Sequence, residues 1–166
     1  MEVKDNFLED IHLTKLDTLI DDHSLPWYLQ KEQTKGQDDG CWLLHSIYDT
    51  NVPRSNLYDP VIEIFNSNLK YISLCKITIN LLLRQESPNK SSFHTDFELL
   101  DKLDEEKMTT SIFYLNTNNG YTEFEGGDII DCVRNRLIIF PTTTSHRAVG
   151  QTDVSKRIVL NFNYIL

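Results

Sequence analysis

The sequence predicts a mainly β domain, a sandwich or barrel of about eight short strands preceded by two helices. Apolar side chains recur at helical spacing in residues 7–20 and 59–70, whereas short apolar segments bounded by turn residues recur from residue 71 onward. The 166 residues are the size of one domain. We therefore expect a single domain in which residues 1–70 give helical support and residues 71–166 form the β core.

Two helices are expected before residue 71, with a short strand candidate between them at residues 41–48. In residues 59–70, Asp59 can cap the helix and Pro60 suits its first position. Residues 7–20 place five apolar side chains near one helical face, namely Leu8, Ile11, Leu16, Leu19 and Ile20. These faces would pack against one side of the sheet.

Turn residues divide the second part of the chain into short strands. Residues 129–133 and 137–140 are expected to pair across Arg134-Asn135. Alternation in the last strand, residues 157–164, places Arg157, Val159, Asn161 and Asn163 on one face, and Ile158, Leu160, Phe162 and Tyr164 on a core face. The other strands are expected at residues 71–84, 109–115, 121–124 and 145–149, with a short extended segment at residues 93–97.

The composition disfavours several classes of function. The net charge of −9 disfavours a nucleic-acid partner, and no apolar stretch is long enough to span a membrane. The start MEVKDNFLED has neither a basic segment nor an apolar core, so we expect no secretory signal and a cytoplasmic location. Cys41, Cys75 and Cys132 lie far apart and match neither a zinc spacing nor a disulfide framework.

The chemically informative residues are His94, Asp96, His146 and Arg157. On extended backbone, His94 and Asp96 point to one face, and His146 is the other histidine of the β half. Two histidines and a carboxylate on one face of Fe(II) leave positions open for substrate and oxygen. Arg157 follows eleven residues after His146, and a guanidinium binds carboxylates through two parallel hydrogen bonds. Each residue alone is more often structural, but their order favours a metal site beside an anion site.

Four segments carry a resemblance to a known family: FHTD (93–96), SIFYLNTNNGYTEFEGGDI (111–129), NRLIIFPTTTSHRAVG (135–150) and RIVLNFNYI (157–165). They resemble the 2-oxoglutarate and Fe(II)-dependent oxygenases, in the branch close to prolyl hydroxylases. The resemblance implies a double-stranded β-helix, a jelly-roll or cupin-like fold, braced by two or three helices. It implies that His94, Asp96 and His146 bind Fe(II), and that Arg157 pairs with the distal carboxylate of 2-oxoglutarate.

The resemblance also bears on four further positions. It implies that Tyr114, in Tyr114-Leu115-Asn116, donates to the same carboxylate, although a core tyrosine is the plain alternative. Asn161 shares the face of Arg157 and is a further candidate for the cosubstrate pocket. Relatives often have a tyrosine some ten residues before the His-x-Asp motif, where this chain has Leu83-Arg84, so Arg84 is a candidate contact. Tyr121 could touch substrate or shield the sheet edge.

The resemblance favours a dioxygenase that uses Fe(II), 2-oxoglutarate and O2 to hydroxylate a peptidyl proline or another protein side chain. A free amino acid or small-metabolite hydroxylase is the second hypothesis. Nucleic-acid demethylation is disfavoured because residues 157–163 contain no second arginine, and a non-catalytic jelly-roll binding module is the non-enzymatic alternative. Residues 28–40 and 85–107 are expected around the mouth of the site. The acidic residues 98–107 form either a solvated loop or a lid that attracts a cationic substrate.

Overall fold

The structure, a computed structural model, describes residues 1–30, 41–96 and 107–166. Within these ranges the chain forms two antiparallel sheets and two helices, and the predicted mainly β jelly-roll class is confirmed. No helix in these ranges is long and apolar enough to cross a membrane.

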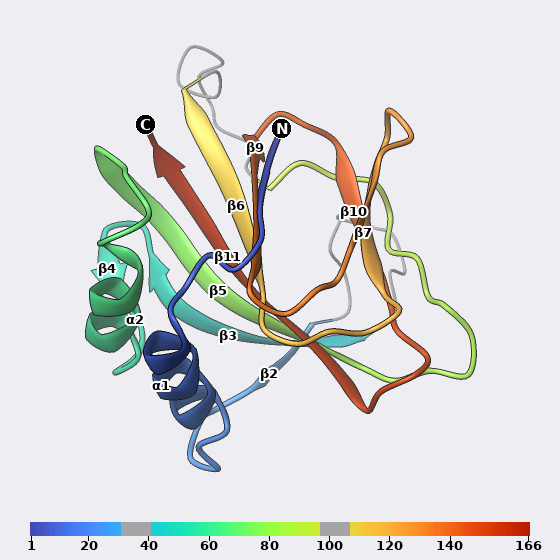
Figure 1. Cartoon of the computed structure of the whole chain (residues 1–166), viewed down its shortest axis with the longest axis horizontal. Helices are drawn as coiled ribbons and strands as arrows, with labels where there is room; N and C mark the ends of the chain where they lie inside the picture. Colours follow the sequence, from blue (N-terminus) through green and yellow to red (C-terminus); the bar gives the residue numbers. More distant parts are fainter. Residues whose placement is uncertain (31–40, 97–106) are drawn as a thin grey trace.

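The large sheet has the strand order β1-β9-β6-β11-β5-β3-β2, with β4 paired to β3. Both helices, α1 (Asp10–Ile20) and α2 (Tyr58–Phe65), lie against one face of this sheet (Figure 1). The strands of the large sheet are β1 (Glu2–Lys4), β2 (Tyr28–Gln30), β3 (Trp42–Asp49), β4 (Val52–Pro53), β5 (Ser73–Leu83), β6 (Met108–Tyr114), β9 (Arg136–Pro141) and β11 (Lys156–Ile165).

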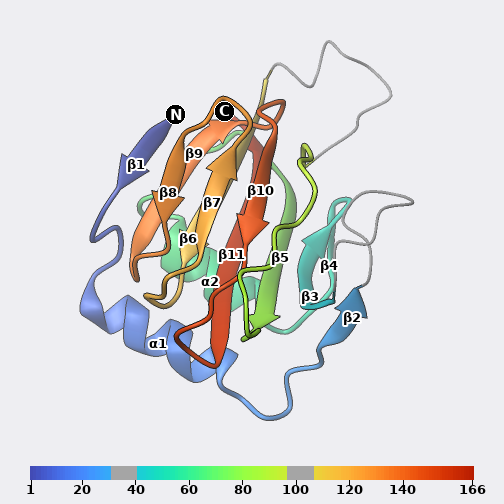
Figure 2. The same ribbon diagram turned by 90° about the vertical axis from the view of Figure 1, so that its right-hand side faces the viewer.

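The small sheet has the order β10-β7-β8 and lies opposite the large sheet, on the side away from the helices (Figure 2). Its strands are β7 (Tyr121–Phe124), β8 (Ile129–Asp131) and β10 (His146–Val149). The large sheet therefore has a helix-covered outer face and an inner face that looks toward the small sheet. The two faces carry different side chains.

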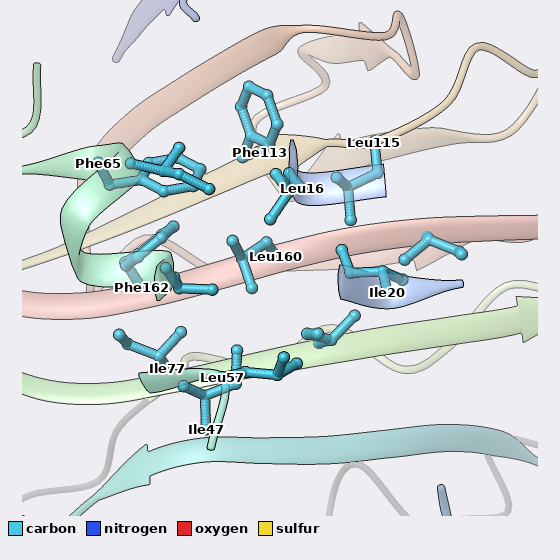
Figure 3. Packing of buried hydrophobic residues seen from close by; sticks show 14 of the residues in the cluster. Leu16, Ile20, Ile47, Leu57, Phe65, Ile77, Phe113, Leu115, Leu160 and Phe162 are labelled. Atoms are coloured by element: carbon cyan, nitrogen blue, oxygen red, sulfur yellow. The ribbon is translucent and has the colours of Figure 1, made fainter. Parts of the chain in front are cut away.

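Apolar side chains from the outer face pack against the helices in one large cluster (Figure 3). The predicted alternation of β11 is confirmed, because Ile158, Leu160, Phe162 and Tyr164 all belong to this cluster. A smaller cluster between the sheets includes Tyr114 and Phe140. The inner face is thus closed by packing at one end of the sheets, and the rest of it is available for a site.

The predicted helices differ in detail from those observed. Ile11 is 71% exposed instead of packed, because helix α1 turns Leu13 and Leu16 toward the sheet. Helix α2 begins one residue earlier than predicted, with Leu57 as N-cap, and makes no side-chain cap hydrogen bond, so Asp59 does not cap it. Pro60 stands in the first turn, where its missing N–H leaves no helical hydrogen bond unmade.

The prediction that residues 129–133 and 137–140 pair with each other is wrong. Strand β8 pairs with β7 in the small sheet, whereas β9 pairs with β6 and β1 in the large sheet. Asn135, between them, adopts φ 64°, a left-handed conformation that redirects the chain from one sheet to the other. Residues 1–70 also supply strands β1–β4 in addition to the helices, so the N-terminal part extends the large sheet.

Candidate metal centre

The two histidines of the predicted site meet through their backbones. His94 and His146 form an isolated antiparallel bridge, in which each backbone N–H donates to the other residue's carbonyl, at 3.0 and 2.9 Å. His146 begins β10, and His94 lies in the extended segment that runs beside it. This pairing brings the two imidazole rings to a centroid distance of 4.7 Å.

Asp96 completes the group. Its Oδ1 lies 3.7 Å from Nε2 of His94 and 3.6 Å from Nε2 of His146. One potential ligand atom of each residue lies within 4.8 Å of the others. Metal–ligand bonds of about 2.1 Å separate neighbouring donor atoms by roughly 3 to 3.5 Å, so small side-chain adjustments would bring all three onto one ion. Coordination by two imidazoles and one carboxylate fits Fe(II) with open positions.

Neighbouring groups fix the orientation of these side chains. Nδ1 of His94 lies 3.1 Å from the carbonyl oxygen of Ser92, and Nδ1 of His146 lies 3.0 Å from that of Thr144. A carbonyl oxygen only accepts, so each Nδ1 must carry the hydrogen and each Nε2 presents its lone pair toward Asp96. This is the arrangement expected of histidine metal ligands.

Asn163 holds the carboxylate of Asp96 from the large sheet. Its Nδ2 donates to Asp96 Oδ2 at 3.2 Å and to Thr110 Oγ1 at 2.9 Å. The other oxygen, Oδ1, is left facing the histidines. The sequence predicted that Asn163 would lie on the inner face of β11 but assigned it no role, because its contact with Asp96 requires the three-dimensional arrangement of the two segments.

A cavity of about 290 Å³ opens between the sheets and contains the three candidate ligands among its lining residues. Arg157, at the start of β11, also lines it and is 1% exposed. Its Nη2 lies 3.4 Å from Thr122 Oγ1, and its Nε has no hydrogen-bond partner among the described residues. No Asp or Glu in the described ranges forms an ion pair with this guanidinium.

Tyr114 and Gly120 both lie close to the side chain of Arg157. The Tyr114 hydroxyl donates to Thr122 Oγ1 at 2.7 Å, and the Arg157 Cζ lies 5.7 Å from the centroid of the Tyr114 ring. Burial raises the pKa of Tyr114 to about 12, although the nearby guanidinium lowers it in part. A Cβ at position 120 would lie 2.8 Å from the Val149 carbonyl oxygen and 3.1 Å from Arg157 Cδ, so only glycine fits there.

The remaining predicted site residues fall into two groups. Asn161 lines the cavity, and its buried Oδ1 has no hydrogen-bond partner among the described residues. Tyr121 is absent from the cavity lining because alternation along β7 turns Thr122 inward in its place. Arg84 is exposed just beyond β5 and also lies outside the lining. Residues 97–106 lie outside the described residues, and with them nearly all of the predicted lid.

Thr122 lies near Arg157, and sequence reasoning assigned it no role in the predicted anion site. The alternation of β7 could have identified it, because Thr122 and Phe124 share the buried face of this strand and Tyr121 lies on the other face. From the segments predicted to surround the mouth, residues 28–40 and 85–107, the cavity lining includes Gln30, Gln85 and Asn89.

No protein-family model matches the chain, and no curated protein matches it by sequence. Solved structures match it by fold. A viral collagen prolyl hydroxylase from Paramecium Bursaria Chlorella virus-1, in complex with 2OG, aligns over 99% of this chain and 95% of its own, with a TM-score of 0.60 and 16% identity. A prolyl-4-hydroxylase from Pseudomonas putida aligns over 99% and 92%, with a TM-score of 0.58 and 15% identity.

The non-heme alpha ketoglutarate dependent carbocyclase SnoK aligns over 98% of this chain and 78% of its own, with a TM-score of 0.68 and 9% identity. These identities are low, so the similarity concerns the fold. The chain has the fold of the 2OG-Fe(II) oxygenases, prolyl hydroxylases among them, over nearly its whole length.

Proposed function

We propose that this protein is a 2-oxoglutarate-dependent dioxygenase whose Fe(II) is held by His94, Asp96 and His146. The observation that carries the proposal is the position of Arg157, a buried guanidinium without an acidic partner in the described ranges, on the same cavity as the three candidate ligands. A buried cation is costly unless an anion or strong hydrogen bonds compensate it. A dicarboxylate cosubstrate would supply that anion and reach the metal.

The chain's own residues would bind and orient the cosubstrate. Arg157 would donate two hydrogen bonds to the distal carboxylate. Thr122 already accepts from Tyr114 and lies close to Arg157, so its own hydroxyl hydrogen is available to the same carboxylate. Tyr114 would then act as a positioning residue through Thr122. Asn161 lies between Arg157 and Asn163 on the inner face of β11, along the path that the cosubstrate would span.

The metal would supply oxygen activation coupled to decarboxylation of 2-oxoglutarate. The remaining task of the chain is to keep the donor atoms in place. Asn163 and the carbonyls of Ser92 and Thr144 hold the three side chains that would bind the ion beside the cavity. Because the metal would supply the oxidation chemistry, the cavity needs no separate general base.

For the substrate, a peptidyl proline or another protein side chain is our leading candidate. Two of the structures that share the fold are named as prolyl hydroxylases, and a further one, from Trichoplax adhaerens, is in complex with a hypoxia inducible factor peptide fragment, with a TM-score of 0.59 and 14% identity. A free amino acid or small metabolite is the second candidate, because a cavity of about 290 Å³ is at the small end of ligand sites.

The test is anaerobic reconstitution with Fe(II) and 2-oxoglutarate, followed by a succinate-release assay in air. We expect a visible charge-transfer absorption from the metal–cosubstrate chelate before oxygen is admitted, and succinate afterwards. His94→Ala should lose both signals. Arg157→Met should retain metal binding and need a far higher 2-oxoglutarate concentration. If wild type and both variants all release succinate only at the same background level, the non-catalytic binding module is the better description.

A further inference from the structure

A second cation, Lys76, lines the cavity. It lies on the inner face of β5, directly beside Asn163, the residue that holds the carboxylate of Asp96. The other neighbour of Lys76 in the sheet is Asp49, and no ion pair joins the two side chains. Among the described residues, the ammonium of Lys76 forms neither an ion pair nor a hydrogen bond, although its side chain is only partly exposed.

The charges that the described residues bring to the cavity do not balance without a further anion. Within residues 1–30, 41–96 and 107–166, the charged lining residues other than the histidines are Arg157, Lys76 and Asp96. In the proposed complex, the two charges of 2-oxoglutarate offset Arg157 and one unit of the Fe(II) charge, and Asp96 offsets the other unit. The positive charge of Lys76 therefore remains on the cavity wall, where partial burial makes a charge pair stronger than in water.

Polar groups on the same strand face indicate what else the ligand carries. Asn80 lines the cavity on the same face as Lys76, and its buried Oδ1 has no donor among the described residues. Trp42 and Leu44, on the neighbouring strand β3, add an apolar wall, with Leu44 directly opposite Asn80. A ligand with a carboxylate, an N–H or O–H donor and a short apolar part would satisfy all of these groups.

We propose that Lys76 is a specificity-determining residue that binds a carboxylate of the substrate, while Asn80 accepts a hydrogen bond from the same molecule. The inference rests on the proposed function and narrows its substrate class to acidic molecules. The carboxylate belongs either to a free amino acid or to an acidic residue of a peptide. Both sources present the same group to Lys76, and the small cavity accommodates either.

The experiment compares matched acidic and neutral probes in the succinate-release assay. One arm uses free L-amino acids against their carboxamides, and the other uses blocked peptides containing Asp or Glu against the same peptides containing Asn or Gln. We expect wild type to prefer the acidic member of each productive pair by about tenfold in kcat/KM. The arm that responds identifies the source of the carboxylate.

Variants at position 76 test the residue itself. Lys76→Met should raise KM for the acidic probe about tenfold and remove the preference, Lys76→Arg should keep it, and Lys76→Glu should reverse it toward neutral probes. Lys70→Met, which removes an exposed lysine, is the matched control, and Asp49→Asn tests the neighbouring carboxylate. Neither control should alter the preference.

The two proposals fail in different ways. If the chelate absorption forms but wild type treats acidic and neutral probes alike, or Lys76→Met keeps the preference, Lys76 is not a substrate contact and the dioxygenase proposal stands. If the chelate absorption never forms, the proposed function is overturned, and the inference about Lys76 with it.

Discussion

Replacing Arg157 with methionine should stabilise the protein in the absence of 2-oxoglutarate and abolish its response to that ligand. Arg157 is 1% exposed, and the groups around its guanidinium are neutral: Thr122 at a long hydrogen-bond distance, the thiol of Cys132 and the more distant ring of Tyr114. An unpaired buried charge costs several kcal/mol, and water in the cavity reduces that cost. We therefore expect the free energy of unfolding of Arg157→Met to rise by about 1 to 3 kcal/mol.

The ligand should offset most or all of the stability that the variant gains. At a hundred times its Kd, 2-oxoglutarate adds about 2.7 kcal/mol to the wild-type free energy of unfolding and none to the variant. For a domain of this size, each kcal/mol shifts Tm by roughly 2 to 4 °C. The variant should melt higher than wild type without the ligand, and 2-oxoglutarate should raise the Tm of wild type alone, which brings it close to or above that of the variant.

Differential scanning calorimetry of the metal-loaded protein, with and without 2-oxoglutarate, measures both effects. Arg54→Met, at an exposed arginine, is the control and should leave Tm and its ligand dependence unchanged. A lower Tm for Arg157→Met without ligand would show that the guanidinium is already satisfied within the protein. An equal ligand-induced shift in variant and wild type would show that the dicarboxylate binds elsewhere.

Three further predictions follow from the contacts described above. Asn163→Ala removes the donor to Asp96 Oδ2 and should weaken metal binding about 10- to 100-fold in a competition titration, without loss of the fold. Asn135→Ala removes two buried hydrogen bonds to the backbone of Leu8 at a residue with positive φ, and should lower the free energy of unfolding in urea by about 2 to 4 kcal/mol. The pKa of Tyr114 is raised to about 12 in the folded state, so the unfolded state loses this proton first as pH rises. The free energy of unfolding should therefore fall by about 1 kcal/mol between pH 9.5 and 11. Tyr114→Phe should remove that part of the pH dependence.

Each of these predictions has a result that contradicts it. Unchanged metal affinity in Asn163→Ala would mean that Asp96 is oriented without the amide. Asn135→Gly loses the same two hydrogen bonds but tolerates the positive φ, so it should be less destabilised than Asn135→Ala. Equal destabilisation of the two variants would show that the positive φ contributes nothing to the loss. Identical pH dependence in Tyr114→Phe and wild type between pH 9.5 and 11 would place the titration on other tyrosines.

The sequence predicted the parts of the fold that follow from periodicity. The strict alternation of residues 157–164 identified both faces of β11 correctly, because a central strand between two different environments needs a period of two. The His-x-Asp spacing likewise predicted two side chains on one face. The meeting of His146 with His94 and Asp96 agrees with the predicted ligand group.

The parts that failed depend on contacts between distant segments. Nothing local in residues 129–140 reveals that β8 and β9 belong to different sheets, since a hairpin and a crossing between sheets use similar turn residues. The exposure of Ile11 depends on how helix α1 is rotated against the large sheet. The sequence predicted no site role for Lys76 or Thr122, because their position on one cavity depends on how the two sheets face each other.

The isolated bridge between His94 and His146 has a consequence for local stability. Two backbone hydrogen bonds join His94 to His146, and those from Ser91 to Ala148 and from Gly150 to Asn89 continue the pairing between two segments that are remote in sequence. An ion bound there would act as a clip that closes a long loop of the chain, and such closures contribute mainly by reducing conformational entropy. Metal loading should therefore slow amide hydrogen exchange in β10 and around His94 more than in the helix-covered face, so that the ion reinforces a pairing that the backbone already makes.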